Sequence, residues 1–386
     1  MRIAFLTTQP RVPWGGCEEL WSAAAAAALA AGHQVLASVY RWPDLPGPLD
    51  RLRAAGARID LRPHFSRYRR STLLTWLRDP FAALTAFDPD VVCVSQGGTY
   101  DIGKPGEQAA LWRARSRRGW PYVVICQCEQ DPPAPRNRDR VRRVFAAAAA
   151  VGFLGDRLHR TAEDHLGGPI PAGRVIQNPF TIGSPGVLPW PPGATLRLLF
   201  VGRLDPAKGA HLIVEALARQ PWRDRDWRLT VAGAGPQRGE LAARIRAAGL
   251  ADRIDLPGFV DDVRGLWRDH HALILPSRAE GLPLAVIEAV LCGRPVAATP
   301  AGSVADWVEE GRSGFLIARP DAAAVDDALE ILWERRDDLQ RMGQAACDRA
   351  LRLRDPDPGR TLLGWLEAAA AARPGAPVRP GAVRTA

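Results

Sequence analysis

Two carboxylates, Glu280 and Glu288, stand eight residues apart in the stretch LPSRAEGLPLAVIEA, residues 275–289. The apolar run 272–275 predicts the end of a buried strand, and Pro283 is well placed to begin a helix. The free N–H groups of that helix would point at the same corner, so a polyanionic ligand could be held there between the two carboxylates. Alone, the pair would also fit acid–base hydrolysis.

A second loop supplies cations. An expected strand at 197–201 is followed by a loop at 202–209, which contains Arg203 and Lys208 and ends where a helix should begin. Two cations beside helix N–H groups are a suitable environment for a diphosphate. The alternative is a capping lysine and a surface arginine.

Strands and helices alternate along the whole chain, and many strands end in glycine. This pattern predicts an α/β fold with two Rossmann-like domains facing each other across a cleft, and ligands at the carboxyl ends of parallel strands. The expected parts, in chain order, are a first domain at 1–178, a proline-rich linker at 179–195, a second domain at 196–355, a helix at 356–372 that packs back on the first domain, and a disordered tail at 373–386. The helices expected in the first domain include 18–31, 72–87, 107–119 and 141–150, the last followed by a strand at 151–154.

The length, composition and charge of the chain restrict the number of domains and the kinds of partner that we expect. With 386 residues, of which 47% are hydrophobic, the chain is long enough for two cores. It carries 51 Lys+Arg against 42 Asp+Glu, and arginines cluster at 51–78 and 136–143. These clusters indicate either an anionic partner, such as a membrane face or lipid phosphate, or a solvated basic surface. The segment 65–78 mixes arginine with aromatic residues and predicts either peripheral membrane contact or an ordinary amphipathic helix.

The same composition favours a cytoplasmic protein. The six cysteines form no CxxC pair and are expected to be reduced thiols. The chain starts directly with a strand-like MRIAFLTT, so no signal peptide is expected, and the alanine-rich runs are too short to span a bilayer. The protein is therefore expected in the cytoplasm, with membrane association limited to the inner face. No nucleic-acid-binding module appears, so nucleic acid is not an expected partner.

Together, three segments resemble the family 4 retaining glycosyltransferases of GT-B fold, of the group 1 type. They are VGRLDPAKGAHLIVEAL at 201–217, SRAEGLPLAVIEAVLCGRPVAATPAGSVADWVEEGRSGFLI at 277–317, and the loop Gly15-Gly16-x-Glu18. The resemblance is strong over about 197–350 and weaker before it. It implies transfer of a sugar from a nucleotide-diphosphate sugar to an acceptor hydroxyl with retention, in cell-surface polysaccharide, glycolipid or secondary-metabolite synthesis. It implies no cofactor and no metal, and an acceptor that could be lipid-linked.

The resemblance also implies roles for residues. Arg203 and Lys208 would stabilise the departing diphosphate, and Glu280 would lie near the donor sugar as the third catalytic residue. Glu288 would accept hydrogen bonds from the ribose. The donor-binding set would be Gly15, Gly16, Gly202, Val260, Gly281, Leu282, Pro283, Leu284 and Glu288.

The acceptor side departs from the family. Many members carry a histidine at the end of the strand that corresponds to 122–126, and here the sequence reads ICQCEQDPP. Gln127 and Glu129 are the nearest polar residues, and a glutamine cannot act as a base. Retaining transfer of this type needs no external base, because the acceptor proton can pass to the departing phosphate. Gln96 and Gly97 end another strand, either as part of the acceptor pocket or as a plain turn.

Rival functions remain open at this point. A sugar-nucleotide epimerase of the same fold would need no acceptor, and a non-catalytic nucleotide-sugar-binding protein would keep the residues without turnover. A phosphorylase is less favoured because no signature for a pyridoxal cofactor appears. The Asp-Pro-Asp triplets at 88–90 and 355–357 resemble metal motifs but read as turns, so no metal site is expected.

Overall fold

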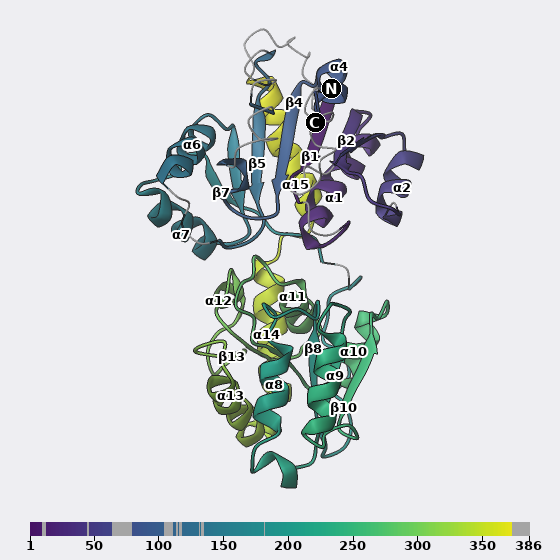
Figure 1. Cartoon of the computed structure of the whole chain (residues 1–386), viewed down its shortest axis with the longest axis vertical. Helices are drawn as coiled ribbons and strands as arrows, with labels where there is room; N and C mark the ends of the chain where they lie inside the picture. Colours follow the sequence, from purple (N-terminus) through teal and green to yellow (C-terminus); the bar gives the residue numbers. More distant parts are fainter. Residues whose placement is uncertain are drawn as a thin grey trace, which may run out of the picture. The chain divides into compact units, whose positions relative to one another are not determined.

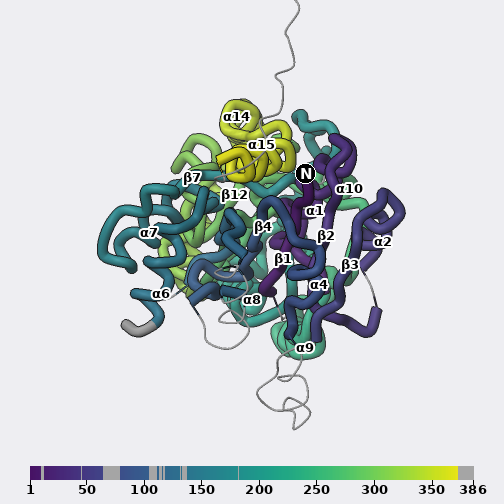
Figure 2. The backbone as a smooth tube through the Cα atoms, turned by 90° about the horizontal axis from the view of Figure 1, so that it is seen from above, coloured from purple at the N-terminus to yellow at the C-terminus, as the bar shows by residue number. Residues whose placement is uncertain are grey.

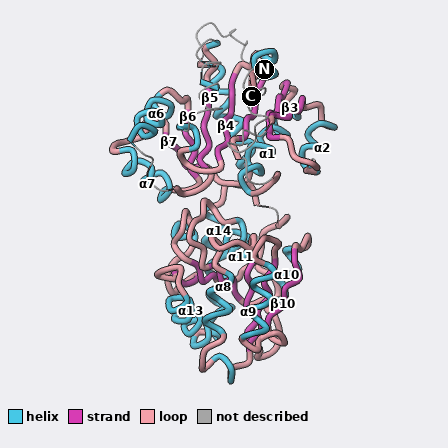
Figure 3. The backbone as a smooth tube through the Cα atoms, in the orientation of Figure 1, coloured by secondary structure: helices cyan, strands magenta, loops and turns pink. Residues whose placement is uncertain are grey.

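A computed structural model describes residues 1–9, 13–44, 46–63, 79–103, 111, 112, 115, 118–130, 132, 135–180 and 182–372. The chain divides into two compact units, each described here by itself. Unit 1 comprises 1–153, 159–179 and the chain from Asp357 onward, and unit 2 comprises 154–158 and 180–356. Strands and helices alternate through both units (Figure 3).

Unit 1 is built on a seven-stranded parallel sheet in the order β3-β2-β1-β4-β5-β6-β7. Its strands are β1 (Arg2–Thr7), β2 (Gln34–Tyr40), β3 (Arg58–Arg62), β4 (Val91–Gln96), β5 (Tyr122–Cys126), β6 (Ala150–Phe153) and β7 (Gly173–Val175). The spatial order of the strands β4, β1, β2 and β3 can be followed across the unit in Figure 2. Strands β4 and β5 are buried along their whole length, as expected for a parallel sheet covered on both faces.

Helices connect these strands. They are α1 (Gly16–Ala30), α2 (Gly47–Ala54), α4 (Ala82–Phe87), the 3₁₀ turn η1 (Asp101–Gly103), α6 (Pro135–Ala146), α7 (Asp156–Leu166) and α15 (Pro358–Ala371). Helix α15, from the far end of the chain, packs on α1 (Figure 1). A methyl group on Gly359 would lie 2.9 Å from the backbone carbon of Ala23, so the two helices touch backbone to backbone. The alanine-rich face of α1 allows that close approach.

Unit 2 repeats the architecture with a six-stranded parallel sheet in the order β10-β9-β8-β11-β12-β13. The strands are β8 (Leu196–Val201), β9 (Trp227–Ala232), β10 (Ile254–Gly258), β11 (Ala272–Leu275), β12 (Val296–Ala298) and β13 (Gly314–Leu316). The helices are α8 (Ala210–Leu217), η2 (Trp222–Asp224), α9 (Arg238–Ala247), α10 (Val263–Asp269), α11 (Leu284–Leu291), α12 (Val304–Trp307), α13 (Ala322–Glu334), η3 (Arg336–Asp338) and α14 (Leu339–Leu353). No helix of the described residues is long and apolar enough to cross a membrane.

The segment predicted as a linker, 179–195, differs from that expectation. From residue 180 it belongs to unit 2, where Arg294 holds it. The buried guanidinium of Arg294 donates to the carbonyl oxygens of Leu188 at 3.3 Å and Pro189 at 2.5 Å, and stacks on Trp190. Its Nε donates to the carbonyl of Trp267 at 2.8 Å. The planar guanidinium has several N–H donors and can bond to all these carbonyls at once. The sequence pattern could not reveal these contacts.

Replacing Arg294 with leucine should lower the free energy of unfolding by about 3 kcal/mol, because the buried carbonyls lose their donors. Guanidinium unfolding measures the change, and limited proteolysis should cut within 182–195 sooner. Arg228→Leu is the control, since that exposed arginine donates to a single carbonyl, of Asp252. Equal stability of the two variants would contradict the role given to Arg294.

Other element predictions were corrected in detail. The helix predicted at 141–150 ends at Ala146, and Ala150 instead opens β6, where it pairs with Val123. Pairing with the sheet outweighs the helix propensity of the alanine run. Helices α2 and α7 were not predicted, although Leu158, Ala162 and Leu166 follow helical spacing and are buried. All six cysteines are free thiols.

Several expectations concern residues outside the described part of the chain. Residues 72–78 of the predicted helix at 72–87 lie there, as do most of the predicted helix at 107–119, the candidate membrane segment at 65–78 and the tail at 373–386. Within the first of these ranges the structure describes α4.

Candidate active site

The loop after β8 places Lys208 through a short turn. In Asp205-Pro206-Ala207-Lys208, the backbone N–H of Lys208 donates to the carbonyl of Asp205 at 3.1 Å, and the Asp205 side chain accepts from the N–H of Ala207 at 2.9 Å. Aspartate at the first and proline at the second position favour such a turn. Gly209 then adopts a φ of +74° and caps α8. The sequence therefore fixes the position of Lys208 locally.

The loop after β11 lies directly beside it, because β8 and β11 are neighbours in the sheet. The N–H of Arg278 donates to the carbonyl of Ala207 at 2.7 Å, which ties the two loops together. The ammonium of Lys208 then reaches both carboxylate oxygens of Glu280, at 2.6 and 2.7 Å. Residues 72 positions apart in sequence thus form one ion pair. Glu280 is buried, whereas 24% of the side-chain surface of Lys208 is exposed to solvent.

The loop after β12 supports the same corner from the other side. The N–H of Ser303 donates to the carbonyl of Gly281 at 2.8 Å, and the hydroxyl of Thr299 donates to the carbonyl of Ser277. A Cβ on Gly302, whose φ is +56°, would lie 2.2 Å from the Gly281 oxygen, so this position requires glycine. The hydroxyl of Ser277 is buried and has no partner among the described residues. Ser277, Thr299 and Gly302 were not among the predicted site residues.

Helix α11 carries the second predicted carboxylate. Pro283 is the N-cap of α11, with a φ of −68°, and the helix begins at Leu284. Glu288 lies on this helix and is buried, with 5% of its surface exposed. Gly281 and Leu282 are also buried, so the solvent-exposed surface of this loop comes mainly from the neighbouring residues.

Each predicted cation has a carboxylate partner. Arg203 binds Asp205 through Nε at 2.6 Å and Nη2 at 2.5 Å, as Lys208 binds Glu280. The sequence analysis did not single out Asp205. Lys208 is also one of only two lysines in a chain that otherwise uses arginine for its positive charges. An ammonium is a compact charge with freely directed donors, whereas a guanidinium binds a carboxylate through a planar fork, so lysine and arginine are not interchangeable here.

The close contact between the two loops predicts a strong effect of Gly209→Ala. The new Cβ would lie 2.4 Å from the carbonyl oxygen of Pro276, so the Lys208 loop would have to move away from Glu280. A displacement of about 1 Å in such a site typically lowers kcat/KM about a hundredfold. Steady-state kinetics measure it. Gly239→Ala is the control, because that helical glycine faces open space and alanine should be tolerated. Similar kinetics in both variants would contradict this account.

Other predicted donor residues lie at neighbouring strand ends. Gly202 follows β8, and its N–H donates to the carbonyl of Ala232 on β9 at 3.0 Å. Val260 follows β10 and is half-buried, beside the exposed ring of Phe259. Thus Gly202, Val260, Lys208 and Glu280 all lie at the carboxyl edge of one sheet, the edge where α/β proteins bind ligands.

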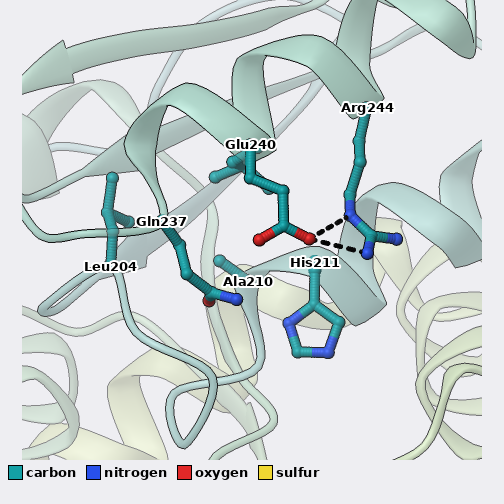
Figure 4. A pocket seen from close by; sticks show the side chains of 7 residues that line it. Leu204, Ala210, His211, Gln237, Glu240 and Arg244 are labelled. Carbon is teal, nitrogen blue, oxygen red and sulfur yellow. Dashed lines mark hydrogen bonds and ion pairs between the residues drawn. The ribbon is translucent and has the colours of Figure 1, made fainter.

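A pocket lies between α8 and α9, next to the loop that follows β8 (Figure 4). Leu204, His211 and Gln237 line it, together with an ion pair in which Arg244 donates to Glu240 at 2.8 Å. Burial, Arg244 and Arg278 lower the pKa of His211. The pocket includes none of the predicted donor residues, so it is not assigned to the diphosphate.

In unit 1 the predicted glycines begin α1. Gly15 is the N-cap with extended backbone angles, φ −171° and ψ −174°, and Gly16 is the first helical residue. Both keep part of their backbone accessible. Glu18 follows in the first turn and is buried, and its Oε1 accepts from the Thr7 hydroxyl at 3.2 Å. Burial raises the pKa of Glu18 to about 8, although a helix N-terminus alone would favour the anion.

The predicted acceptor residues are largely engaged within unit 1. Gln96 is fully buried, and its amide donates to the carbonyl of Thr99 at 3.1 Å and accepts from the N–H of Ile102 at 2.6 Å. Gln127 donates to the carbonyl of Cys17 at 3.3 Å and accepts from Asn178 at 3.1 Å.

Both glutamine side chains are therefore buried and hydrogen-bonded within unit 1. Gly97 leaves room for the side chain of Gln9, whose Nε2 would lie 2.6 Å from an added Cβ. Glu129 is half-buried beyond β5. Of the four predicted acceptor residues, only Gly97 and Glu129 keep partial exposure.

The fold and the donor-side corner define the class: an α/β protein of two Rossmann-like units with a cation–carboxylate cluster at the sheet edge of unit 2. Residues 195–335 match the family model "Glycosyl transferases group 1". The matched residues lie in unit 2, where the resemblance read from the sequence is strongest.

Curated relatives match the same region. They include an alpha-D-kanosaminyltransferase of Streptomyces kanamyceticus, 31% identical over 39% of this chain and 39% of that protein. A D-inositol 3-phosphate glycosyltransferase of Arthrobacter sp. (strain FB24) is 34% identical over 40% of this chain and 38% of that protein. The matches span about two fifths of the length of these curated relatives.

Solved structures share the fold along almost the whole chain. HepE of Anabaena, crystallised with UDP, gives a TM-score of 0.74 at 20% identity, covering 95% of this chain and 100% of that one. Sucrose-phosphate synthase of Thermosynechococcus elongatus gives 0.73 at 18% identity, covering 95% and 98%. The predicted GT-B fold is confirmed by these comparisons.

Proposed function

We propose that this protein is a retaining glycosyltransferase that moves a sugar from a nucleotide-diphosphate sugar to an acceptor hydroxyl without a metal ion or other cofactor. The observation that carries the proposal is the contact of Lys208 with Glu280, which joins the two motifs of unit 2 at one sheet edge. The matched relatives are named as glycosyltransferases, which favours transfer over the epimerase alternative. UDP and UDP-glucose occupy structures of HepE, a protein of the same fold, which supports a nucleotide-sugar donor.

In this proposal the donor diphosphate replaces the two carboxylates as the partner of the two cations. Arg203 and Lys208 turn from Asp205 and Glu280 toward the phosphate oxygens as the glycosidic bond breaks. Negative charge then builds up on the leaving diphosphate, where preorganised cations lower the barrier most. Released from Lys208, Glu280 can accept from a hydroxyl of the donor sugar.

Glu288 would accept from the ribose hydroxyls, and the main-chain N–H groups of Gly281 to Leu284 would bind sugar and phosphate oxygens. The acceptor oxygen attacks the anomeric carbon on the face that the diphosphate leaves, and its proton passes to a phosphate oxygen. The new bond therefore keeps the anomeric configuration, and no protein base is needed.

The test is an activity panel with UDP-, GDP- and ADP-glucose, first without an acceptor. A transferase should hydrolyse its own donor slowly, releasing nucleoside diphosphate. Proton NMR of the sugar released or transferred should show the same anomer as the donor, and EDTA should leave the rate unchanged. Isomerised sugar nucleotide without cleavage would favour an epimerase, and binding without cleavage would favour a non-catalytic protein. An inverted product or an EDTA-sensitive rate would overturn the corresponding part of the proposal.

The acceptor could be carried on a lipid, with the enzyme bound peripherally at the inner face of a membrane. Helix α6 supports this part of the proposal, because Arg142 and Arg143 are exposed on it while Val141 and Phe145 are buried. Cosedimentation with phosphatidylglycerol vesicles should exceed that with phosphatidylcholine vesicles and fall with added salt. Equal recovery with both vesicles would remove membrane contact from the proposal.

A further inference from the structure

The loop between β8 and α8 holds a carboxylate beside one of its own cations. Asp205 lies two residues after Arg203, and its Oδ2 accepts from Nε of the guanidinium at 2.6 Å and from Nη2 at 2.5 Å. The side chain of Asp205 is 11% exposed, whereas that of Arg203 is 51% exposed. The carboxylate therefore binds one edge of a guanidinium that stays half exposed to solvent.

Asp205 also has a second anchor, which does not involve Arg203. Its other oxygen, Oδ1, accepts from the main-chain N–H of Ala207 at 2.9 Å, within the turn that ends at Lys208. Aspartate commonly makes this contact at the first position of a turn. When Arg203 swings toward the diphosphate in the proposed reaction, the turn keeps the Asp205 carboxylate in place. A negative charge then lies close to the phosphate groups and repels them.

The charge on the ligand changes during the proposed reaction. A nucleotide-diphosphate sugar carries two negative charges on its diphosphate. The terminal phosphate of the product receives the acceptor's proton and loses it to water at neutral pH, because the second ionisation of such a phosphate has a pKa of about 6. The nucleoside diphosphate therefore ends with one more negative charge than the donor brought. A fixed carboxylate repels this product more strongly than it repels the donor.

We infer that Asp205 makes this site discriminate between the two diphosphates: its charge weakens the binding of the nucleoside diphosphate product more than that of the nucleotide-sugar donor, and so favours product release. The inference rests on the proposed function, for which it supplies a means of limiting product inhibition. Arg203 remains the phosphate-binding group, and Asp205 makes no bond to the ligand. Once the product leaves, Asp205 binds Arg203 again, as in the structure.

The experiment measures binding of UDP, GDP and ADP, and of their glucose esters, to the full chain by calorimetry at about pH 7.5, where the product is fully ionised. Asp205→Asn removes the charge and keeps the shape, and its amide oxygen can still accept from Ala207. We expect this variant to bind the nucleoside diphosphate about fivefold more tightly, the scale of a half-exposed ion pair, and the nucleotide sugar at most about twofold more tightly. In steady-state kinetics the inhibition constant of the product should fall by the same factor, while the donor KM changes little.

Asp321→Asn is the matched control. Asp321 also accepts from an arginine two residues before it, Arg319, at 2.9 Å, and from the N–H of Ala324 at 2.9 Å, but it follows β13 at the edge of the sheet. This variant loses the same charge and should bind both ligands as the unchanged protein does.

The direction of the change separates the possible outcomes. Weaker binding of both ligands by Asp205→Asn would mean that Asp205 only positions Arg203, and a purely structural role would have the same effect. That result, unchanged affinities, or equal changes for donor and product would each overturn the inference and leave the proposed function standing. If none of the three diphosphates or their glucose esters binds the unchanged protein, the proposed function itself is overturned.

Discussion

Lys208→Ala should lower kcat about a thousandfold while the protein remains folded. The ammonium is the donor that reaches both oxygens of Glu280, and in the proposed reaction it transfers to the diphosphate as charge develops there. Its side chain is partly exposed, so removing it opens no core cavity. The loss should therefore appear in turnover, measured by release of nucleoside diphosphate, and circular dichroism should be unchanged.

Two further variants make this result specific. Lys208→Arg keeps the charge but replaces a compact ammonium with a planar fork, and activity should still fall at least about tenfold. Arg244→Ala is the control, because its ion pair with Glu240 is exposed and should contribute little to stability. Kinetics of Lys208→Ala within twofold of the unchanged protein would sink the donor-site assignment and, with it, the proposed leaving-group chemistry.

Glu18 should make the stability of unit 1 depend on pH. Burial raises its folded-state pKa from 4.5 to about 8, with a smaller contribution from the charge of Glu19, while the Thr7 hydroxyl and the Gly15 hydrogen bond lower it. The buried thiol of Cys17 lies beside Glu18 and stays neutral because burial raises its pKa as well. Between pH 4.5 and about 8 the folded protein therefore holds a proton that the unfolded chain releases. The free energy of unfolding must fall as pH rises through that window and level off above it.

The upper limit of this loss is about 5 kcal/mol, from a shift of between three and four pKa units. Glu18→Gln removes the titrating group and keeps its shape, so the variant should unfold at higher denaturant than the unchanged protein at pH 8, with the difference vanishing near pH 4.5. Guanidinium titrations at several pH values provide the measurement, with Glu19→Gln as control. A variant that keeps the same pH slope would show that Glu18 is ionised throughout.

Local sequence patterns predicted the strands and loops in which the candidate donor residues lie. The strand at 197–201 with its following loop, and the apolar strand before Glu280, were predicted from simple patterns, and the structure has β8 and β11 there. The alternating strands and helices also predicted the two parallel sheets, because that order leaves few other ways to bury strands on both faces.

Sequence patterns do not show a side chain's environment where distant parts of the chain set it. Gln96 and Gln127 were predicted as acceptor contacts at strand ends, and the structure adds that loop and strand-end groups of unit 1 bond to both amides. The segment 179–195 was predicted as a linker because prolines interrupt any helical pattern, and the structure adds that Arg294, about a hundred residues later, binds its carbonyls at Leu188 and Pro189. No local signal marks such a donor.

Glu280 and Glu18 show which features the sequence determines and which only the tertiary structure decides. The sequence by itself placed Lys208 and Glu280 in loops that follow two predicted strands, because apolar strand patterns and loop residues are encoded locally. Only the tertiary structure decided that Glu280 neutralises Lys208 and that Glu18 is buried enough to keep its proton. Both outcomes depend on which groups from other strands exclude water from a carboxylate, and that exclusion exists only once the sheets have formed.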